Sequence, residues 1–484
     1  MPPVSSPGSH EHRVKPKRAA QDRASRIRFR RAMTLVLMTL ALPGSAQLVA
    51  GNRRIGRIAV RISIGVFTTV VFCVLLSLAW HGFAFWVATH TFPLAVIRIV
   101  LILVAVGWAA LFMDAWRLGQ PLSLEQNQRL AIVGLNGLLC FSVAGVLLFG
   151  AHLINVQRDF IIAVFGDGTK SEATDGRYNV LLMGGDSGAG RWGLRPDSLT
   201  IASIDADTGR TVLFGLPRNM EDFPFKNGSP MAEQFPHGFD CDGCYLNGVM
   251  TWAADHTKLF KGSKNPGVDA EISAIEGITG LEINYWAMVN LQGFKDLVDA
   301  VGGVTLHVRD RIPVGGLGDD VTGYIEPGVH RLDGHDTLWF ARAREGSDDY
   351  SRMARQKCVM SAMLEQISPK TMVTKFESIA KATSGMVETN LPASELQNFM
   401  DLAMKAKSQK IATVSFVPPM INSAEPDIAL IKRKVAEAID RAEGTAPPPG
   451  KGKRKHPATV TGGSYGDHDK GYAANQADDL HSAC

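Results

Sequence analysis

The sequence lacks the motifs of two common nucleotide-binding folds. No Gly-Lys-Ser or Gly-Lys-Thr occurs, which excludes the phosphate loop of nucleotide hydrolases. Residues 188–193 (GAGRWG) match the dinucleotide pattern G-x-G-x-x-G, but Pro196 and a strand-like run follow them instead of the helix that must hold a pyrophosphate. Neither kind of nucleotide site is therefore expected.

Strong charge of one sign is also missing. The net charge is only +4 over 484 residues, and the basic excess lies in residues 13–31 and 451–455. Basic residues ahead of an apolar segment usually set membrane topology or contact anionic lipid headgroups. We therefore expect membrane lipid as a partner, and no nucleic acid.

The sequence does contain long runs with little or no charge, at residues 62–80, 93–113 and 132–152. Each has roughly the 20 residues that an α-helix needs to cross the hydrocarbon core of a bilayer. We expect an α-helical transmembrane region of three spans within residues 53–155.

An earlier apolar run, residues 32–52, contains the helix-breaking stretch LPGSAQ at 42–47 and has arginines on both flanks. Because basic flanks remain in the cytoplasm, we interpret this run as a re-entrant or interfacial hairpin that follows a basic cytoplasmic N-terminus at residues 1–31. Three crossings then place the chain after residue 152 on the outer side, whereas four would leave it in the cytoplasm. The expected protein is multi-pass in the cytoplasmic membrane, with an extracytoplasmic second half.

The second half alternates strand and helix patterns after a connector at 156–175. Strands are expected at 178–183, 198–205, 211–216, 285–290, 304–308 and 411–417, and helices at 246–260, 267–278, 291–301, 351–367 and 394–407. This order predicts a three-layer α/β domain over residues 176–420, with a mixed central β-sheet and helices on both faces. A C-terminal helix at 421–440 and a disordered tail at 441–484 are expected to follow.

Three cysteines of this second half are disulfide candidates. An oxidising compartment favours disulfides among Cys241, Cys244 and Cys358, in a pairing that the sequence leaves open. The C-x-x-C spacing of Cys241 and Cys244 also suits zinc or a redox pair, but no second Cys/His pair at zinc-finger spacing and no thioredoxin-like context accompanies it. We expect a structural disulfide.

Charged residues lie at the ends of three predicted strands. Asp186 follows the first strand, Arg195 and Asp197 precede the second, and Arg218 ends the third. Ligands bind at strand ends in open α/β sheets, where two carboxylates would hold a Mg²⁺-type cation and guanidinium groups match phosphate oxygens. Surface salt bridges are the alternative, and the spacing alone favours them.

A second charged cluster follows Trp339 and consists of Arg342, Arg344, Asp349, Arg352, Arg355 and Gln356. On an extended segment, Arg342 and Arg344 would project to one face and could grip one pyrophosphate. Arg352, Arg355 and Gln356 would be near neighbours on the following helix. A solvated helix face explains the same spacing equally well.

Together, these stretches resemble the LytR-CpsA-Psr family of cell-wall glycopolymer transferases, actinobacterial type, over residues 176–370. The resemblance rests on the order and spacing of LLMGGD ending at Asp186, RPDS from Arg195, LPR ending at Arg218, NLQGF from Asn290 with DAVGGV from Asp299, LDG from Leu332, and ARAR ending at Arg344 with Arg352, Arg355 and Gln356.

By position, the resemblance implies that Asp186 and Asp197 hold Mg²⁺ or Mn²⁺. Catalytic contacts to the diphosphate of a polyprenyl-linked glycan would come from Arg195, Arg218, Arg342 and Arg344. The same site would be lined by Arg191, Arg352, Arg355, Gln356 and Asp349, the last being the best candidate for a general base. Two departures from the family are Ser187-Gly188, where an Arg is frequent and Arg191 would substitute, and Asn219, where an Asp is frequent. An acid/base role at position 219 is therefore not expected.

The implied reaction is an attack by a peptidoglycan hydroxyl on the phosphorus nearer the sugar. Polyprenyl phosphate leaves, and a phosphodiester joins the glycopolymer, for example arabinogalactan, to the wall. Two alternatives remain open. One is a polyprenyl-diphosphate phosphatase or pyrophosphatase that uses water as the acceptor. The other is a non-catalytic protein that binds the wall or regulates its synthesis.

Overall fold

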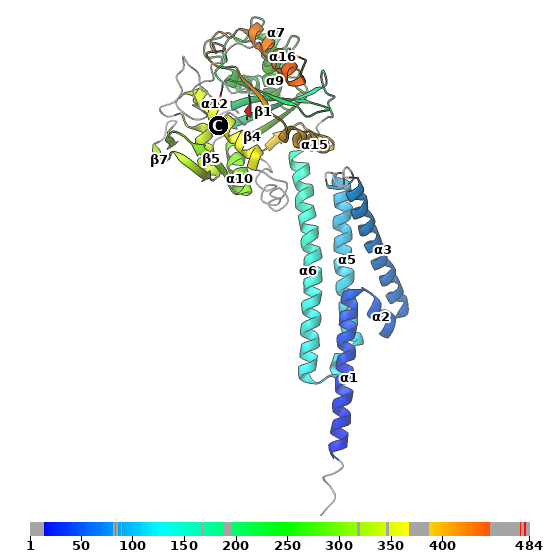
Figure 1. The fold of residues 1–484 in the computed structure, drawn as a ribbon. Helices are drawn as coiled ribbons and strands as arrows, with labels where there is room; N and C mark the ends of the chain where they lie inside the picture. The colour runs from blue at the N-terminus through cyan, green and yellow to red at the C-terminus, as the bar shows by residue number, and fades with distance from the viewer. Residues whose placement is uncertain are drawn as a thin grey trace, which may run out of the picture. The chain divides into compact units, whose positions relative to one another are not determined.

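The computed structural model of this chain describes residues 14–80, 83, 86–88, 90–165, 169–186, 195–316, 320–344, 348–366, 387–445, 475 and 479–480. The chain divides into two compact units, Met1–Arg158 and Asp159–Cys484. Figure 1 labels the helices and strands of each unit.

The first unit is helical throughout its described residues. Its helices are α1 (Val14–Ala41), α2 (Ser45–Ala50), α3 (Arg53–Ala79), α5 (Thr91–Leu118) and α6 (Gln126–Val164), the last of which runs on into the second unit. Three segments are long and apolar enough to cross a membrane, namely Arg53–Ala79, Thr91–Ser123 and Gln126–Ile162. They overlap the three predicted spans, and they provide a membrane anchor.

The expected hairpin at residues 32–52 is a break between α1 and α2. Gly44 adopts a positive φ of 96° at the turn, which glycine allows at little steric cost. The hydroxyl of Ser45 donates to the carbonyl of Met38 at 2.7 Å, and the side-chain amide of Gln47 donates to the carbonyl of Leu111 at 3.0 Å. Neighbouring groups thus complement the polar groups at the break. The place of this hairpin in a bilayer stays a prediction.

The second unit is built on a mixed sheet of six strands. The strands are β1 (Arg177–Asp186), β2 (Arg195–Asp205), β3 (Thr211–Leu216), β4 (Tyr285–Asn290), β9 (Val387–Thr389) and β10 (Ala412–Ser415), in the order β10-β3-β2-β1-β4-β9. The β1–β4 and β3–β10 pairs are parallel, and the other pairs are antiparallel. All six strand predictions of the sequence fall on strands of the structure.

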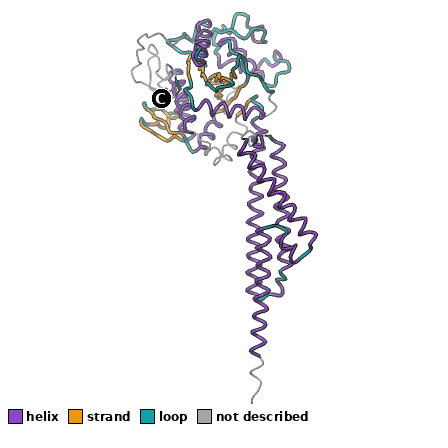
Figure 2. Tube along the Cα trace, turned by 45° about the vertical axis from the view of Figure 1, so that its right-hand side comes forward, coloured by secondary structure: helices purple, strands orange, loops and turns teal. Residues whose placement is uncertain are grey.

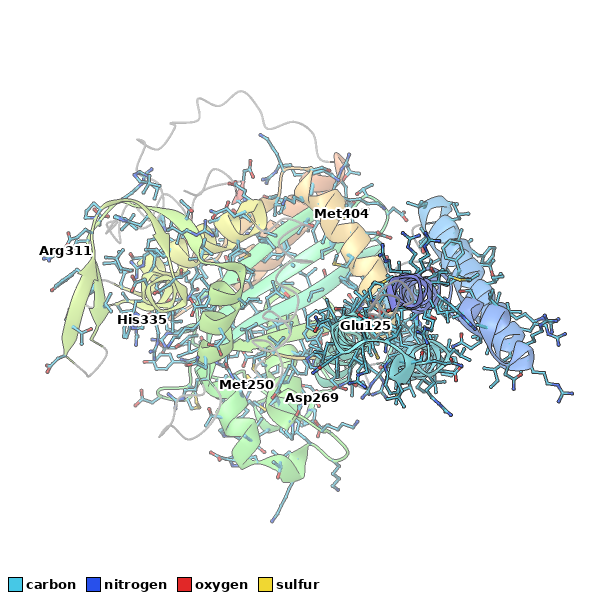
Figure 3. The ribbon with its side chains drawn as sticks, turned by 90° about the horizontal axis from the view of Figure 1, so that it is seen from below. Glu125, Met250, Asp269, Arg311, His335 and Met404 are labelled. Atoms are coloured by element: carbon cyan, nitrogen blue, oxygen red, sulfur yellow. A yellow bond between two sulfur atoms is a disulfide. The ribbon has the colours of Figure 1, made fainter. Side chains whose placement is uncertain are left out.

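Alternate residues of the strands build two different cores. Leu181, Ile201 and Phe214 pack on one face with α8 (Val249–Asp255), α9 (Pro266–Thr279) and α16 (Ile428–Glu443). Ala202 and Leu213 face the other way, towards Met360 of α12 (Asp349–Gln366), and α15 (Leu396–Lys407) packs on the same side. Figure 3 shows Met404 of α15 on one side of the sheet, and Met250 and Asp269 on the other. The predicted three-layer architecture is confirmed.

A smaller core forms beside the sheet. Two hairpin-like pairs, β5 (Val304–Val308) with β8 (Gly328–Leu332) and β6 (Ile312–Gly315) with β7 (Val321–Ile325), pack with α10 (Leu291–Val301), α11 (Gly334–Arg342) and α12. Figure 2 separates these short strands from the central sheet. The sequence patterns did not predict β6, β7, β8 or α11, nor β9 at the edge of the central sheet. The helix expected at 246–260 is divided into α8 and a short 3₁₀ turn on each side.

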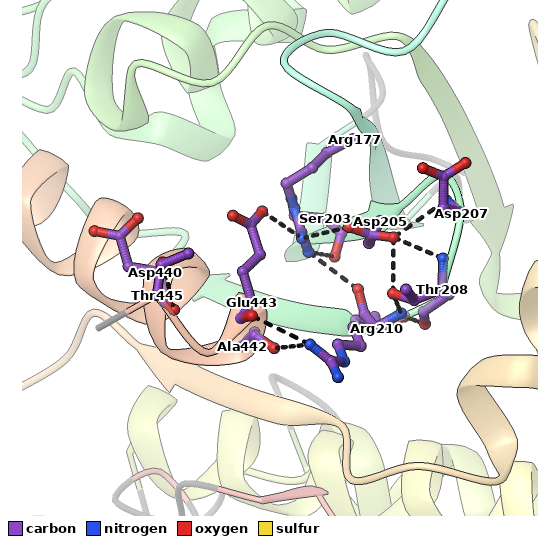
Figure 4. Close-up of polar contacts among 12 residues, drawn as sticks. Arg177, Ser203, Asp205, Asp207, Thr208, Arg210, Asp440, Ala442, Glu443 and Thr445 are labelled. Atoms are coloured by element: carbon purple, nitrogen blue, oxygen red, sulfur yellow. Dashed lines mark hydrogen bonds and ion pairs between the residues drawn. The ribbon is translucent and has the colours of Figure 1, made fainter. Parts of the chain in front are cut away.

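A buried arginine fastens the end of α16 to the sheet. Arg177 of β1 donates from Nε to the hydroxyl of Ser203 at 2.9 Å, and its Nη1 lies 3.2 Å from Oε1 of Glu443. Its Nη2 donates to the carbonyl of Arg210 at 3.1 Å (Figure 4). Burial lowers the pKa of Arg177, and Glu443 opposes that shift. The predicted C-terminal helix at 421–440 corresponds to α16.

The tail expected to be disordered contacts the domain at its described residues. The side-chain amide of Asn475 donates to the carbonyl of Tyr350 at 2.8 Å. Leu480 is fully buried against Ala202 and Leu213, and its backbone N–H donates to the carbonyl of Ile411 at 2.9 Å. Disorder is therefore wrong at residues 441–443, which end α16, and at residues 475 and 480, while residues 446–474, 476–478 and 481–484 lie outside the described part of the chain.

Candidate active site

The register of the sheet brings together two charged residues that the sequence places at strand ends. β2 and β3 pair antiparallel, with Leu199 opposite Leu216. Asp197, near the start of β2, therefore lies beside Arg218, which follows the end of β3. Nη1 of Arg218 forms an ion pair with Oδ1 of Asp197.

The N-terminus of α12 adds a second carboxylate to this pair. Asp349 is the first residue of α12, and its Oδ2 lies 3.0 Å from Nε of Arg218. Nη2 of Arg218 donates to Oδ1 of the same carboxylate at 3.4 Å. One guanidinium thus joins the strand-end cluster to the cluster around α12, and both predicted clusters belong to one site.

Two further arginines face the same carboxylates. Nη1 of Arg344 lies 3.4 Å from Oδ1 of Asp349. Nη1 of Arg352, one turn into α12, lies 3.7 Å from Oδ1 of Asp349 and 3.7 Å from Oδ1 of Asp197. Three guanidinium groups therefore surround two carboxylates, which leaves this group of five residues with a positive excess.

Burial and charge act in opposite directions on these groups. Burial alone would raise the pKa of Asp349, but Arg352, Arg218 and Arg344 outweigh it and lower this pKa below its usual value. Burial lowers the pKa of Arg352 to about 10, although Asp349 and Asp197 oppose that shift. Burial alone would also lower the pKa of Arg218, but Asp197 and Asp349 outweigh it and raise this pKa. Asp349, Arg218 and Arg352 are therefore ionised at neutral pH.

The other strand-end residues lie close by along the backbone. Asp186 is the last residue of β1 and pairs in register with Arg195, the exposed first residue of β2. The side chain of Asp186 and the whole of Arg191 lie outside the described part of the chain. The roles expected for these three residues stay predictions.

Arg342 is the last residue of α11, and Arg344 follows it on the segment that leads to α12. The sequence hypothesis placed both on one extended stretch, whereas the structure places Arg342 at the last turn of α11 and Arg344 after it. The guanidinium carbon of Arg342 lies 5.8 Å from the ring centroid of Trp339, within reach of a cation–π contact. Both arginine side chains are half-buried.

The structure does not support a substrate contact for Arg355. Its guanidinium is buried within the protein, where it donates to the carbonyls of Phe340 and Ala343 and to the hydroxyl of Ser351. The spacing of Arg352 and Arg355 places them on adjacent helix faces, and only Arg352 has described contacts to the site carboxylates. Gln356 donates to the carbonyl of Ala341 at 3.3 Å.

Apolar residues that the sequence reasoning did not assign lie beneath the site. A small cavity of about 30 Å³ separates α12 from the sheet, and its lining includes Met353, Gln356 and Met360 of α12 with Leu213 and Gly215 of β3. Residues 353, 356 or 357, and 360 recur at helical spacing, which is the signal that could have identified this face. A larger cavity of about 680 Å³, near Lys258 and Asp269, shares no residue with the charged site.

The predicted structural disulfide forms between Cys241 and Cys244. Cys358, which is buried in α12, is also disulfide-bonded. Its partner therefore lies outside the three candidate cysteines, so the expected pairing among these three is wrong for Cys358. No structural sign of a zinc site accompanies Cys241 and Cys244 among the described residues.

The fold and the site together describe a membrane-anchored α/β domain with a charged site at its strand ends. A mixed α/β domain carries guanidinium and carboxylate groups at its strand ends, where anionic ligands bind, and an apolar helical anchor precedes it. The chain belongs to the LytR_cpsA_psr family, whose model matches residues 161–425.

Curated relatives are similar to about half of this chain. A polyisoprenyl-teichoic acid–peptidoglycan teichoic acid transferase, TagU of Oceanobacillus iheyensis, is 27% identical over 225 residues, which cover 46% of this chain and 61% of the relative. Biofilm regulatory protein A of Streptococcus mutans is 25% identical over 273 residues, which cover 55% of this chain and 62% of the relative. The chain thus spans about three fifths of the length of these relatives.

Two solved structures are similar to a little over half of this chain. The crystal structure of Bacillus subtilis TagV has 22% sequence identity and a TM-score of 0.40, covering 57% of this chain and 100% of that chain. Protein gbs0355 from Streptococcus agalactiae has 20% identity and a TM-score of 0.42, covering 54% of this chain and 86% of that one.

Proposed function

We propose that this protein transfers a glycopolymer from a polyprenyl-diphosphate donor to peptidoglycan and forms a phosphodiester link. The observation that carries the proposal is that Arg218, Arg344 and Arg352 contact two carboxylates among the described residues, at the strand ends of a membrane-anchored domain. Family membership supports it, as do the names of the relatives that act on polyisoprenyl-linked teichoic acid and peptidoglycan.

A diphosphate would replace contacts that the arginines now make within the protein. Arg218 donates three hydrogen bonds to the carboxylates of Asp197 and Asp349, and Arg344 donates one to Asp349. Guanidinium groups bind phosphate oxygens with the same planar, two-pronged geometry that they use for carboxylates. The carboxylates thus hold the guanidinium groups together until the substrate arrives.

A divalent cation fits the donor chemistry. All described contacts of Asp197 within the cluster involve Oδ1, so its Oδ2 remains able to act as an oxygen ligand of the type that Mg²⁺ or Mn²⁺ prefers. We propose that Asp197 and Asp186 hold this cation. When bound, it would neutralise charge that spreads onto the phosphoryl oxygens.

In the proposed reaction, the oxygen of a peptidoglycan hydroxyl bonds to the phosphorus nearer the sugar, and its proton passes to the surrounding water. The bond from that phosphorus to the bridging oxygen breaks, and polyprenyl phosphate leaves. Arg218, Arg342, Arg344 and Arg352 stabilise the transferring phosphoryl group and align it, which is the principal task in this type of chemistry. Asp349 keeps the arginines in place and is a weak base, because their charges lower its pKa.

The location of both substrates sets the topology that we propose. A polyprenyl-linked donor and peptidoglycan meet at the outer leaflet, so the domain after α6 is placed there, with multi-pass anchoring by the three apolar helices. The three-span interpretation of the sequence delivers the domain to that side. Arabinogalactan is the glycopolymer that we propose to test first.

The test uses the full chain in detergent with a polyprenyl-diphosphate glycan and peptidoglycan oligomers. A linked conjugate that requires Arg218 supports transfer, with Arg311→Lys, an exposed change outside the site, as the matched control. Release of free phosphorylated sugar without conjugate would instead establish the phosphatase alternative. A donor that is converted neither to conjugate nor to free phosphorylated sugar would favour a binding or regulatory protein.

A further inference from the structure

The segment that carries Arg342 and Arg344 leaves α11 without a closing motif of its own. Ala343, the residue after the helix, is extended with φ −53° and ψ 135°. It is therefore not the left-handed glycine that commonly closes a helix C-terminus. The last carbonyls of a helix also have no partners within the helix. The direction of the two arginine side chains must be fixed from elsewhere.

Arg355 of α12 supplies that support. Its side chain is only 1% exposed, and its Nε donates to the carbonyl of Phe340 at 2.6 Å. Its Nη2 donates to the carbonyl of Ala343, so one guanidinium holds the backbone on both sides of Arg342. Hydrogen bonds from an ionised donor are short and strong, and a positive charge at a helix C-terminus is favourable.

The pattern of burial explains why the backbone held by Arg355 directs Arg342 and Arg344 away from the protein interior. Ala341 is 8% exposed and Ala343 is 2% exposed, so these two small side chains face the protein interior. Arg342 and Arg344, which alternate with them, are only half-buried. Nη1 of Arg344 then reaches Asp349, the first residue of the helix that also carries Arg355.

A third hydrogen bond of Arg355, made within α12, holds its side chain in place. Nη1 of Arg355 donates to the hydroxyl of Ser351 at 2.8 Å, one turn earlier on α12, which fixes the plane of the guanidinium. Helix α12 therefore provides both a carboxylate partner for Arg344 and a clamp for the backbone that carries it.

We propose that Arg355 is a positioning residue, which sets the direction of Arg342 and Arg344 towards the diphosphate and does not touch the substrate. The inference rests on the proposed function. Lysine at this position would keep the positive charge, but a single ammonium cannot reproduce the planar fork that reaches two carbonyls and a hydroxyl.

The test measures binding of geranylgeranyl diphosphate to the full chain in detergent, together with the melting temperature. Arg355→Lys is expected to weaken binding by about 10-fold to 100-fold. The matched control is Arg331→Lys, because Arg331 also donates to a backbone carbonyl, that of Gly302 at 2.7 Å, but is exposed and outside the site. Wild-type affinity in Arg355→Lys would overturn the inference.

A double-mutant comparison separates positioning from a purely structural role. In an Arg344→Ala background, Arg355→Lys should lower the melting temperature as much as it does in the wild type, but its effect on affinity should shrink at least threefold. An undiminished loss of affinity in that background would overturn the inference, because Arg355 would then act independently of Arg344.

Ser351→Ala provides a milder probe where Arg355→Lys does not fold. It removes the hydroxyl that accepts one hydrogen bond from Arg355, and it is expected to weaken binding by about 3-fold to 10-fold. Unchanged affinity in Ser351→Ala would then count against the clamp. Failure of the wild-type chain to bind the prenyl diphosphate would instead overturn the proposed function, so the two failures are distinguishable.

Discussion

Arg218 links two carboxylates from opposite ends of the domain sequence: its Nε lies 3.0 Å from Oδ2 of Asp349, while its Nη1 pairs with Oδ1 of Asp197. The pairing of β2 with β3 supplies one contact, and the start of α12 supplies the other. A residue in this position controls the arrangement of the whole charged site.

Replacing Arg218 by lysine is predicted to lower kcat/KM for glycopolymer transfer by about 100-fold to 1,000-fold. The cause is loss of the planar group that can turn from two carboxylates to the phosphate oxygens. Initial rates with a polyprenyl-diphosphate donor measure the effect, and Arg311→Lys should stay near the wild-type rate. A fall of less than threefold in Arg218→Lys would remove Arg218 from the catalytic site.

Asp349 is predicted to make acid stability depend on its charge. Its pKa in the folded protein lies below the unfolded value of about 4, so its stabilising effect is present above pH 4 and is lost as pH falls through the folded pKa. Melting temperatures between pH 7 and pH 3 should fall less steeply in Asp349→Asn than in the wild type. Asp401→Asn, at an exposed position of α15, is the control. Equal slopes in all three proteins would contradict the ion pairs.

Glu271 is predicted to have the opposite effect on how stability changes with pH. This residue is fully buried in α9, and neither of its carboxylate oxygens has a hydrogen-bond partner among the described residues. Burial raises its pKa well above the usual value. Its contribution to stability therefore declines as pH rises above the unfolded pKa of about 4.3. The unfolded chain ionises freely in this range, whereas the buried carboxyl group of the folded state does not.

Glu271→Gln is accordingly predicted to raise the free energy of unfolding at pH 8, by about 1 to 3 kcal/mol, and to flatten its decline between pH 5 and pH 8. Denaturant unfolding at these two pH values measures the change. Glu425→Gln alters an exposed residue and should leave the decline in place. A variant that is less stable than the wild type at pH 8 would show that Glu271 has a partner.

How far the sequence predicted these features depended on the range of the interactions. Long apolar runs indicated the three membrane helices, and short ones indicated five of the six strands of the sheet, because burial on both faces leaves a continuous apolar signal. Strand-end positions correctly brought Asp197 and Arg218 to one edge. The strands β6 to β9 and helix α11 were missed because they are too short to carry a clear pattern.

The role of Arg355 was not accessible to the same reasoning. Arg352 and Arg355 are three residues apart on one helix, and spacing does not tell which guanidinium meets carboxylates and which meets backbone carbonyls. That difference depends on where α11 ends, because the carbonyls of Phe340 and Ala343 are available only there. Tail contacts such as that of Leu480 were hidden for a similar reason, since one apolar residue in a polar segment has no periodicity.

Leu480 gives a stability prediction for the tail. Leu480→Ala should lower the free energy of unfolding by about 2 to 4 kcal/mol, because it leaves a void between Ala202 and Leu213. Thermal or denaturant unfolding measures the loss, with Val329→Ala, at a position that is 72% exposed, as the control. Equal stability of the two variants would show that the tail does not pack on the sheet in solution.

An experiment in H₂¹⁸O distinguishes a wall hydroxyl from water as the acceptor. The full chain, a polyprenyl-diphosphate glycan and peptidoglycan oligomers are incubated in the labelled water, and the masses of the phosphorylated products are measured by mass spectrometry. The expected product is a glycopolymer–peptidoglycan phosphodiester without ¹⁸O, formed by the wild type and lost in Asp197→Ala. Free sugar phosphate that carries one ¹⁸O from water, with no conjugate, would contradict transfer to a wall hydroxyl.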